Sequence, residues 1–209
     1  MERRFFSDET CPVAIEKRGD GQPVIVGYAA VFHVPGDEGT EYQLFSDLKE
    51  RIMPRAFNKA LQERHDAVGL LNHDPNHVLG RVSAGTLKLA KDQRGLRYEI
   101  TPPASRADVV ESIQRGDIKG SSFGFRVLEQ KFKTEDGMDV REIHSVELLD
   151  VSPVTFPAYK GTTAGMRAMG ETDEIRSAYD AFKAEKVEAE RAKRERLDAI
   201  VARAKEVCG

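Results

Sequence analysis

The chain has very little cysteine and no tryptophan. Its only cysteines, Cys11 and Cys208, lie near opposite ends of 209 residues and have no CxxC spacing. Such cysteines argue against a zinc or thioredoxin-type site and predict free thiols in a reducing compartment. The sequence also lacks an apolar run long enough to span a bilayer.

The chain also lacks a large net charge of either sign. The 32 basic and 35 acidic residues give a formal net charge of -3, so there is no electrostatic case for binding nucleic acid or an anionic membrane. Residues 1–9 contain charges but no apolar signal segment. We therefore expect a soluble, cytoplasmic protein, long enough for one domain with an additional element and a core without disulfides or metals.

The first two-thirds of the chain predict strands and turns. Apolar, β-branched or aromatic runs predict strands at residues 24–32, 68–73, 78–89, 96–101, 121–132 and 141–156. Short helices are predicted from about Pro54 and over residues 107–114, the second ending at Gly116. This pattern indicates an α+β, mainly β fold: a small, mostly antiparallel β-barrel, closed or nearly closed, decorated by short helices.

Composition changes near Gly161. We expect a barrel domain over residues 1–160, a flexible linker over 161–170 and a charged helical C-terminal extension over 171–209. Residues 183–196 are almost entirely charged or alanine, so the helix buries little and is expected to project or to pack on a partner.

His73 lies at the end of an apolar strand and precedes the turn residues 74–76. A histidine there is well placed to act as a general base, because its pKa lies near neutrality. Taken alone, this position is more typical of a polar residue that ends a strand. His73 and His77 could also bind a metal, but Pro75 predicts a turn and no third ligand stands out.

Two further segments carry candidate groups. Ser121 and Ser122 precede Gly124, where a glycine leaves space for a substrate backbone and for amides that hold an oxyanion. The alternative is a strand edge with tight packing. Glu147 and Asp150 interrupt an apolar strand. An acid at such a position is either a buried carboxylate that pairs with a histidine or a charge at the protein surface.

In order and spacing, these segments resemble the prohead proteases of tailed bacteriophages, distant relatives of the herpesvirus assemblins. The resemblance rests on Gly27–Phe32, Ile52–Phe57, Leu71–Asp74, Leu79–Arg81, Gly95–Leu96, Ser121–Phe125 and Asp150–Ala158. It implies a small, mostly antiparallel barrel decorated by helices.

The resemblance also implies roles for single residues. His73 matches the family's base, and Ser122, rather than Ser121, matches its nucleophile. Asp150 matches the third member, where the family usually has glutamate, so Glu147 stays open as the alternative acid. The oxyanion donors are expected near Ser122 and Gly124, and Pro153 suggests a bulge or a free edge.

In function, the resemblance implies a serine endopeptidase that needs no cofactor and acts inside the assembling procapsid, in the host cytoplasm. Its expected substrates are the major capsid protein, scaffold segments and the protease itself, with no role for nucleic acid or membrane. A homodimer or higher oligomer is expected from the assemblin relatives. Alternatives are a non-enzymatic capsid scaffold or assembly protein on the same fold and, more remotely, a metal-dependent hydrolase using His73 and His77.

Overall fold

The computed structural model describes residues 1–6, 8–156 and 171–208. The chain divides into two compact units, Met1–Arg167 and Ala168–Gly209, which are described separately. The predicted linker, residues 161–170, lies outside the described residues.

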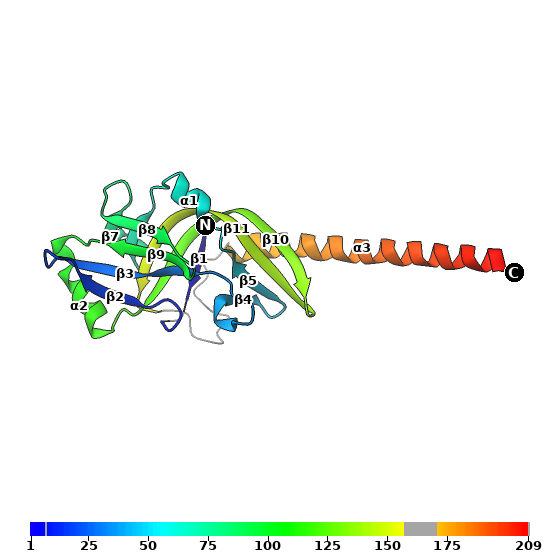
Figure 1. The fold of residues 1–209 in the computed structure, drawn as a ribbon, viewed down its shortest axis with the longest axis horizontal. Coiled ribbons are helices and arrows are strands. Elements are labelled where there is room, and N and C mark those ends of the chain that lie inside the picture. The colour runs from blue at the N-terminus through cyan, green and yellow to red at the C-terminus, as the bar shows by residue number, and fades with distance from the viewer. Residues whose placement is uncertain (7, 157–170, 209) are drawn as a thin grey trace. The chain divides into compact units, whose positions relative to one another are not determined.

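The first unit is built mainly from strands (Figure 1). Its strands are β1 (Glu2–Phe5), β2 (Val13–Lys17), β3 (Pro23–Val31), β4 (Glu41–Phe45), β5 (Leu48–Ile52), β6 (Val68–Leu71), β7 (Asp74–Arg81), β8 (Leu87–Lys91), β9 (Gly95–Ile100), β10 (Gly120–Glu135) and β11 (Met138–Val154). Its helices are α1 (Asn58–Gln62) and α2 (Ala107–Arg115), with 3-10 turns at η1 (Glu38–Thr40) and η2 (Ala104–Arg106).

Within the described residues, the strands form two sheets. The larger has the order β1-β10-β11-β5-β4, with β6 beside β11 and β7 beside β6, and the smaller has the order β2-β3-β9-β8. Most neighbours are antiparallel, but β5 and β6 run parallel to β11. The mainly β prediction is confirmed, whereas the closed barrel is not found. Strand patterns show which residues face a core, but not which distant strands meet.

One hydrophobic core takes side chains from both sheets. Ile25 and Tyr98 of the smaller sheet are fully buried, as are Phe123 and Val146 of the larger one. Cys11 belongs to this core as a free thiol, and burial raises its pKa to about 12. The prediction of a free thiol is confirmed for Cys11, and the Cys208 side chain lies outside the described residues.

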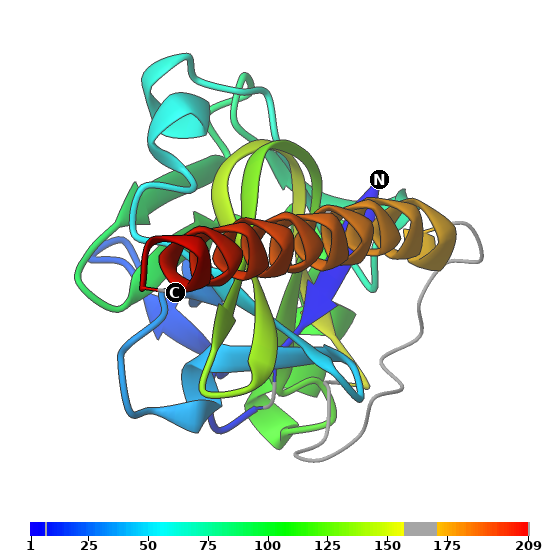
Figure 2. The ribbon, with the colours of Figure 1, turned by 90° about the vertical axis from the view of Figure 1, so that its right-hand side faces the viewer.

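The hairpin of β10 and β11 is the longest feature of the larger sheet, and its two arms run side by side in both ribbon views (Figures 1 and 2). Asp136 and Gly137 connect the arms with φ of 49° and 78°. Positive φ at both central residues is the geometry of the two-residue hairpin turn that suits twisted strands.

Two local predictions are wrong in their bounds. The helix expected from Pro54 begins at Asn58, because the preceding residues form turns that bury Ala56 and Phe57 completely. The single strand expected over residues 78–89 is divided into β7 and β8 by a turn at Gly85, which has a φ of 70°. Packing and turn geometry outweigh local propensity at both places.

Helix α2 ends as predicted, with Gly116 in the left-handed region at φ 82°.

In the second unit, α3 (Glu171–Cys208) is the predicted long helix, and Val187, Leu197, Ile200 and Val201 are exposed on it. Among the described residues, no helix combines the length and apolarity needed to cross a membrane.

Candidate active site

His73 lies inside a two-residue turn that joins β6 to β7. Asn72 and His73 have φ of 55° and 58°, and Leu71 pairs with Asp74 across the turn. The turn therefore includes His73 itself and begins two residues earlier than the turn predicted at residues 74–76. Asparagine and histidine are among the non-glycine residues that adopt this left-handed conformation most often.

Asn72 fixes this turn to the end of β11. Its backbone amide donates to the carbonyl of Pro153 at 3.0 Å, and its side-chain oxygen accepts from the amide of Thr155 at 2.9 Å. A bulge or a free edge was expected at Pro153; no register shift occurs there, so the bulge is not found. These bonds hold the His73 turn against the strand that carries Asp150.

The His73 ring lies between a hydroxyl and a carboxylate. Its Nε2 is 2.6 Å from Ser122 Oγ, and its Nδ1 is 2.5 Å from Asp150 Oδ1. His73, Ser122 and Asp150 are 4%, 0% and 5% exposed, so solvent scarcely competes for these contacts. Phe5 packs against the imidazole with ring centroids 5.3 Å apart.

Strand register explains how the sequence brings Ser122 and Asp150 together. In the β10–β11 ladder, Ser122 pairs with Ser152 and Gly124 pairs with Asp150. Alternate residues of a strand share one face, so these four residues lie together on one side of the sheet. The small residues at 122 and 124 leave the space that the Asp150 carboxylate and the His73 ring occupy.

Ser152 is a residue of this cluster that the sequence analysis did not identify. Its hydroxyl donates to Asp150 Oδ1 at 2.8 Å and lies 3.3 Å from the His73 backbone nitrogen. It therefore holds the carboxylate and the histidine turn at once. The spacing in Asp150-Val151-Ser152, which puts both polar residues on one face of a strand, is the signal that could have revealed it.

Ser121 points to the other side of β10. Its hydroxyl lies 2.8 Å from the hydroxyl of Tyr98, and burial raises the pKa of that phenol. This neighbourhood is part of the core, away from His73. Of the two adjacent serines, only Ser122 contacts the imidazole.

Other sequence candidates lie elsewhere. Glu147 pairs with Arg126 at 2.9 Å, and both side chains are substantially exposed. Arg81, which belongs to one of the segments of the resemblance, pairs with Asp66. His77 is 3.8 Å from the carboxylate of Asp74, and the described residues contain no group of three metal-ligating side chains.

The arrangement can activate an oxygen nucleophile. A hydroxyl hydrogen-bonded to an imidazole can give up its proton as it attacks a carbonyl carbon, and a carboxylate on the other ring nitrogen orients the ring and stabilises its charged form. This chemistry is acyl transfer, and it requires no metal or organic cofactor.

Comparisons with known proteins point to the same chemistry. The family model described as caudovirus prohead serine protease matches residues 10–175. Searches of curated proteins and of solved structures each gave no significant match. The relationship to herpesvirus assemblins stays a prediction. Because the family model covers most of the chain, including the segments that carry His73, Ser122 and Asp150, the chain belongs to the caudovirus prohead serine protease family.

Proposed function

We propose that this prohead protease is a serine endopeptidase with Ser122 as nucleophile, His73 as general base and Asp150 as the orienting acid. The observation that carries the proposal is the bridging position of the His73 ring, 2.6 Å from Ser122 Oγ and 2.5 Å from Asp150 Oδ1. Asp150 is favoured over Glu147 because the latter pairs with Arg126 at the surface.

In this mechanism His73 Nε2 takes the proton of Ser122 as Oγ attacks the scissile carbonyl carbon. The tetrahedral intermediate collapses as His73 returns the proton to the leaving amine. Water, activated by the same imidazole, then hydrolyses the ester and regenerates the hydroxyl. Asp150 keeps the charged imidazole oriented throughout.

The backbone amide of Phe123 is the best placed oxyanion donor. The amide of Phe6 donates to the carbonyl of Ser121 at 3.3 Å, so the backbone polar groups of Ser121 face the β1 side of β10. On the other side, the residue of β11 that lies opposite Ser121 is Pro153, which has no amide hydrogen to donate. Alternation in an antiparallel ladder then turns the Phe123 amide toward β1, and that of Ser122 toward β11. Losing one such donor typically costs about 10²–10³ in rate.

The proposed substrates are the major capsid protein, scaffold segments and the protease chain itself. The proposed place of action is the assembling procapsid in the host cytoplasm. The family supports a role in prohead processing, and self-cleavage would suit the charged helix α3 as a removable extension that docks on capsid or scaffold protein. A homodimer or larger oligomer is proposed only on the expected assemblin kinship.

The test is intact-mass spectrometry of the wild type, Ser122→Ala and Ser121→Ala, each incubated with and without the cognate capsid protein. Cleavage by the wild type and Ser121→Ala but not by Ser122→Ala is expected. Ser121→Ala is the matched control, because that serine faces Tyr98 in the core. Cleavage by Ser122→Ala would refute the nucleophile, and no cleavage by any protein would favour a non-enzymatic assembly role.

A further inference from the structure

Strand β1 covers the proposed nucleophile. It pairs antiparallel with β10 so that Phe5 lies opposite Ser122 and Arg4 opposite Phe123. Ser122 is 0% exposed, so a substrate has no access to it while β1 is in place. The family match begins at residue 10, so it does not describe this strand.

The backbone of β1 engages the nucleophile directly. Ser122 Oγ donates a hydrogen bond to the carbonyl oxygen of Arg4 at 2.8 Å. The hydroxyl has one proton, so while it donates to Arg4 it does not donate to His73. The same carbonyl faces the amide of Phe123 by the alternation of the ladder. The carbonyl of Arg4 therefore lies where a scissile carbonyl would have to lie.

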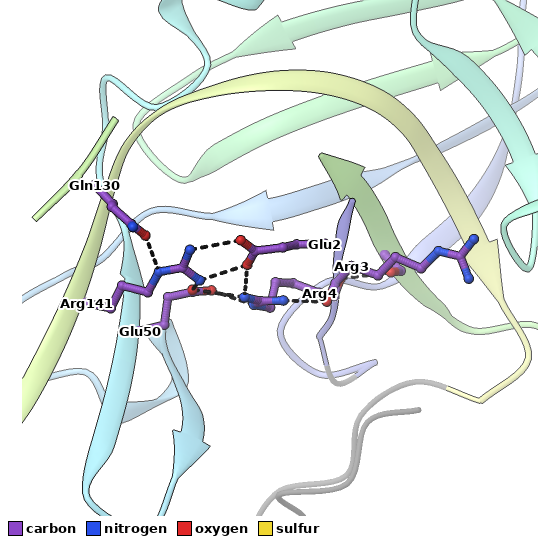
Figure 3. Close-up of polar contacts among 7 residues, drawn as sticks. Glu2, Arg3, Arg4, Glu50, Gln130 and Arg141 are labelled. Atoms are coloured by element: carbon purple, nitrogen blue, oxygen red, sulfur yellow. Dashed lines mark hydrogen bonds and ion pairs between the residues drawn. The ribbon is translucent and has the colours of Figure 1, made fainter. Parts of the chain in front are cut away.

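The side chains of β1 alternate between two environments (Figure 3). Glu2 and Arg4 point to one face and enter a buried cluster with Glu50 and Arg141, whereas Arg3 points away. Arg4 Nε is 2.5 Å from Glu50 Oε1, and Arg4 Nη2 is 2.5 Å from Glu2 Oε2.

Arg141 completes this buried charge cluster. Its Nη1 lies 2.8 Å from a carboxylate oxygen of Glu2 and of Glu50, and its Nε donates to Gln130 at 2.6 Å. The side chains of Glu2, Arg4, Glu50 and Arg141 are at most 9% exposed. Two acids and two arginines make the cluster neutral, and removing β1 takes away one charge of each sign.

We propose that β1 occupies the substrate-binding edge of β10 and marks the sequence preference of the site. The preferred substrate is an extended peptide with a basic residue directly before the cleaved bond and an acidic residue two positions earlier. Its two side chains replace those of Arg4 and Glu2 beside Glu50 and Arg141. This inference rests on the proposed peptidase function and adds the peptide that the site selects.

Three features support this assignment. An extended peptide that adds a strand to an open edge gains main-chain hydrogen bonds, and pockets for alternate side chains supply selectivity. A lone basic or acidic residue would leave the buried cluster with a net charge, whereas the acid-x-base pair keeps it neutral. Because β1 belongs to the same chain, it competes with substrate at a high effective concentration.

The covalent step follows from this register. Ser122 Oγ forms an ester with the carbonyl carbon of the basic residue, and the bond to the next residue's nitrogen breaks. His73 carries the serine proton to that leaving amine. Water then hydrolyses the ester, releasing a peptide that ends in the basic residue.

The first experiment compares synthetic peptides with the wild-type protein and with Arg4→Ala. The reference peptide repeats residues 2–6, Glu-Arg-Arg-Phe-Phe, between neutral flanks. Three matched peptides replace its first glutamate by glutamine, replace its second arginine by leucine, or exchange these two residues. We expect cleavage after the second arginine, with kcat/KM about tenfold or more lower for each altered peptide.

The same assay tests whether β1 occludes the site. Arg4→Ala removes the side chain that joins β1 to Glu50, so we expect it to cleave the reference peptide about tenfold faster than the wild type. A fluorophosphonate probe that labels an active serine should react faster with Arg4→Ala as well. Glu50→Gln should weaken the preference for arginine over leucine directly before the cleaved bond. If that variant does not fold, the four peptides with the wild-type protein still test the sequence preference.

Two results separate this inference from the proposed function. If the probe labels Ser122 but all four peptides are cleaved at equal rates, the substrate assignment alone is overturned. The same follows if the probe labels Ser122 but Arg4→Ala cleaves the reference peptide no faster than the wild type. No labelling and no cleavage by any variant would overturn the proposed function and this inference with it. Cleavage of the chain itself between Arg4 and Phe5 would support the same register.

Discussion

The carboxylate of Asp150 fills the space that a side chain at Gly124 would need. A β-carbon built on Gly124 would lie 2.1 Å from Asp150 Oδ2, closer than any real contact of that kind. The register of β10 and β11 sets this, because the two residues are direct partners in the ladder. The glycine is thus required by the position of the acid beside His73.

Gly124→Ala should therefore displace Asp150 from the His73 ring. We expect kcat to fall about 10²-fold, since small misplacements of catalytic groups cost rates of that order. Overpacking should also lower the free energy of unfolding by about 1–3 kcal/mol. Peptide cleavage rates and denaturant unfolding measure the two effects.

Gly19→Ala is the matched control, because Gly19 is exposed and has no atom within 4 Å of an added β-carbon. It should leave both quantities unchanged. If Gly124→Ala kept the wild-type kcat, Asp150 would not be needed in its observed position.

The resemblance, rather than local patterns, singled out His73, Ser122 and Asp150. Apolar patterns predicted the strands that carry or precede them, and all three strands are present, although the first ends at Leu71 and not at His73. The two-residue turn that contains His73 was missed, because Asn-His is not a common sequence for such a turn.

Longer-range relationships were beyond the sequence. Ser152 touches Asp150 and the His73 backbone only because β6 lies beside β11, a pairing that alternation patterns do not reveal. In the same way, β1 is a four-residue strand rich in charge, without the apolar pattern that predicts burial. Its burial depends on partners that are distant in sequence, Glu50 and Arg141.

Ser152 acts as a positioning residue in the proposed mechanism. Its hydroxyl holds one oxygen of Asp150 at 2.8 Å, the same oxygen that contacts His73 Nδ1. Ser152→Ala should lower kcat about tenfold with little change in KM, because the substrate does not touch this residue. Steady-state kinetics on the reference peptide give both parameters.

A merely structural role of Ser152 would lower the thermal midpoint without lowering kcat per folded molecule. Ser145→Ala is the control, since Ser145 lies on the same strand and is only partly buried. Equal kcat for both variants would remove Ser152 from the mechanism.

The buried charge cluster should make the protein lose stability in acid. Burial raises the pKa of Glu2, but the hydrogen bond from Arg141 and the charges of Arg4 and Arg141 outweigh this effect, so the pKa of Glu2 lies below its ordinary value. A carboxyl whose pKa is lower in the folded protein stabilises it fully above the unfolded value and progressively less as pH falls through the folded value. The stability that Glu2 supplies should therefore be present at about pH 6 and decline below about pH 4.5.

Denaturant unfolding of the wild type and Glu2→Gln at about pH 6 and about pH 3 measures this contribution. Removing one partner of a buried ion pair typically costs about 3–5 kcal/mol, so the variant should be clearly less stable at the higher pH. The difference between the two proteins should shrink at the lower pH, because the unfolded chain then binds a proton at Glu2 more readily than the folded protein does. Glu16→Gln, at an exposed pair with Arg97 3.8 Å apart, should change little at either pH. A Glu2→Gln effect that stays constant from about pH 6 to about pH 3 would show that the Glu2 charge does not hold β1 in place.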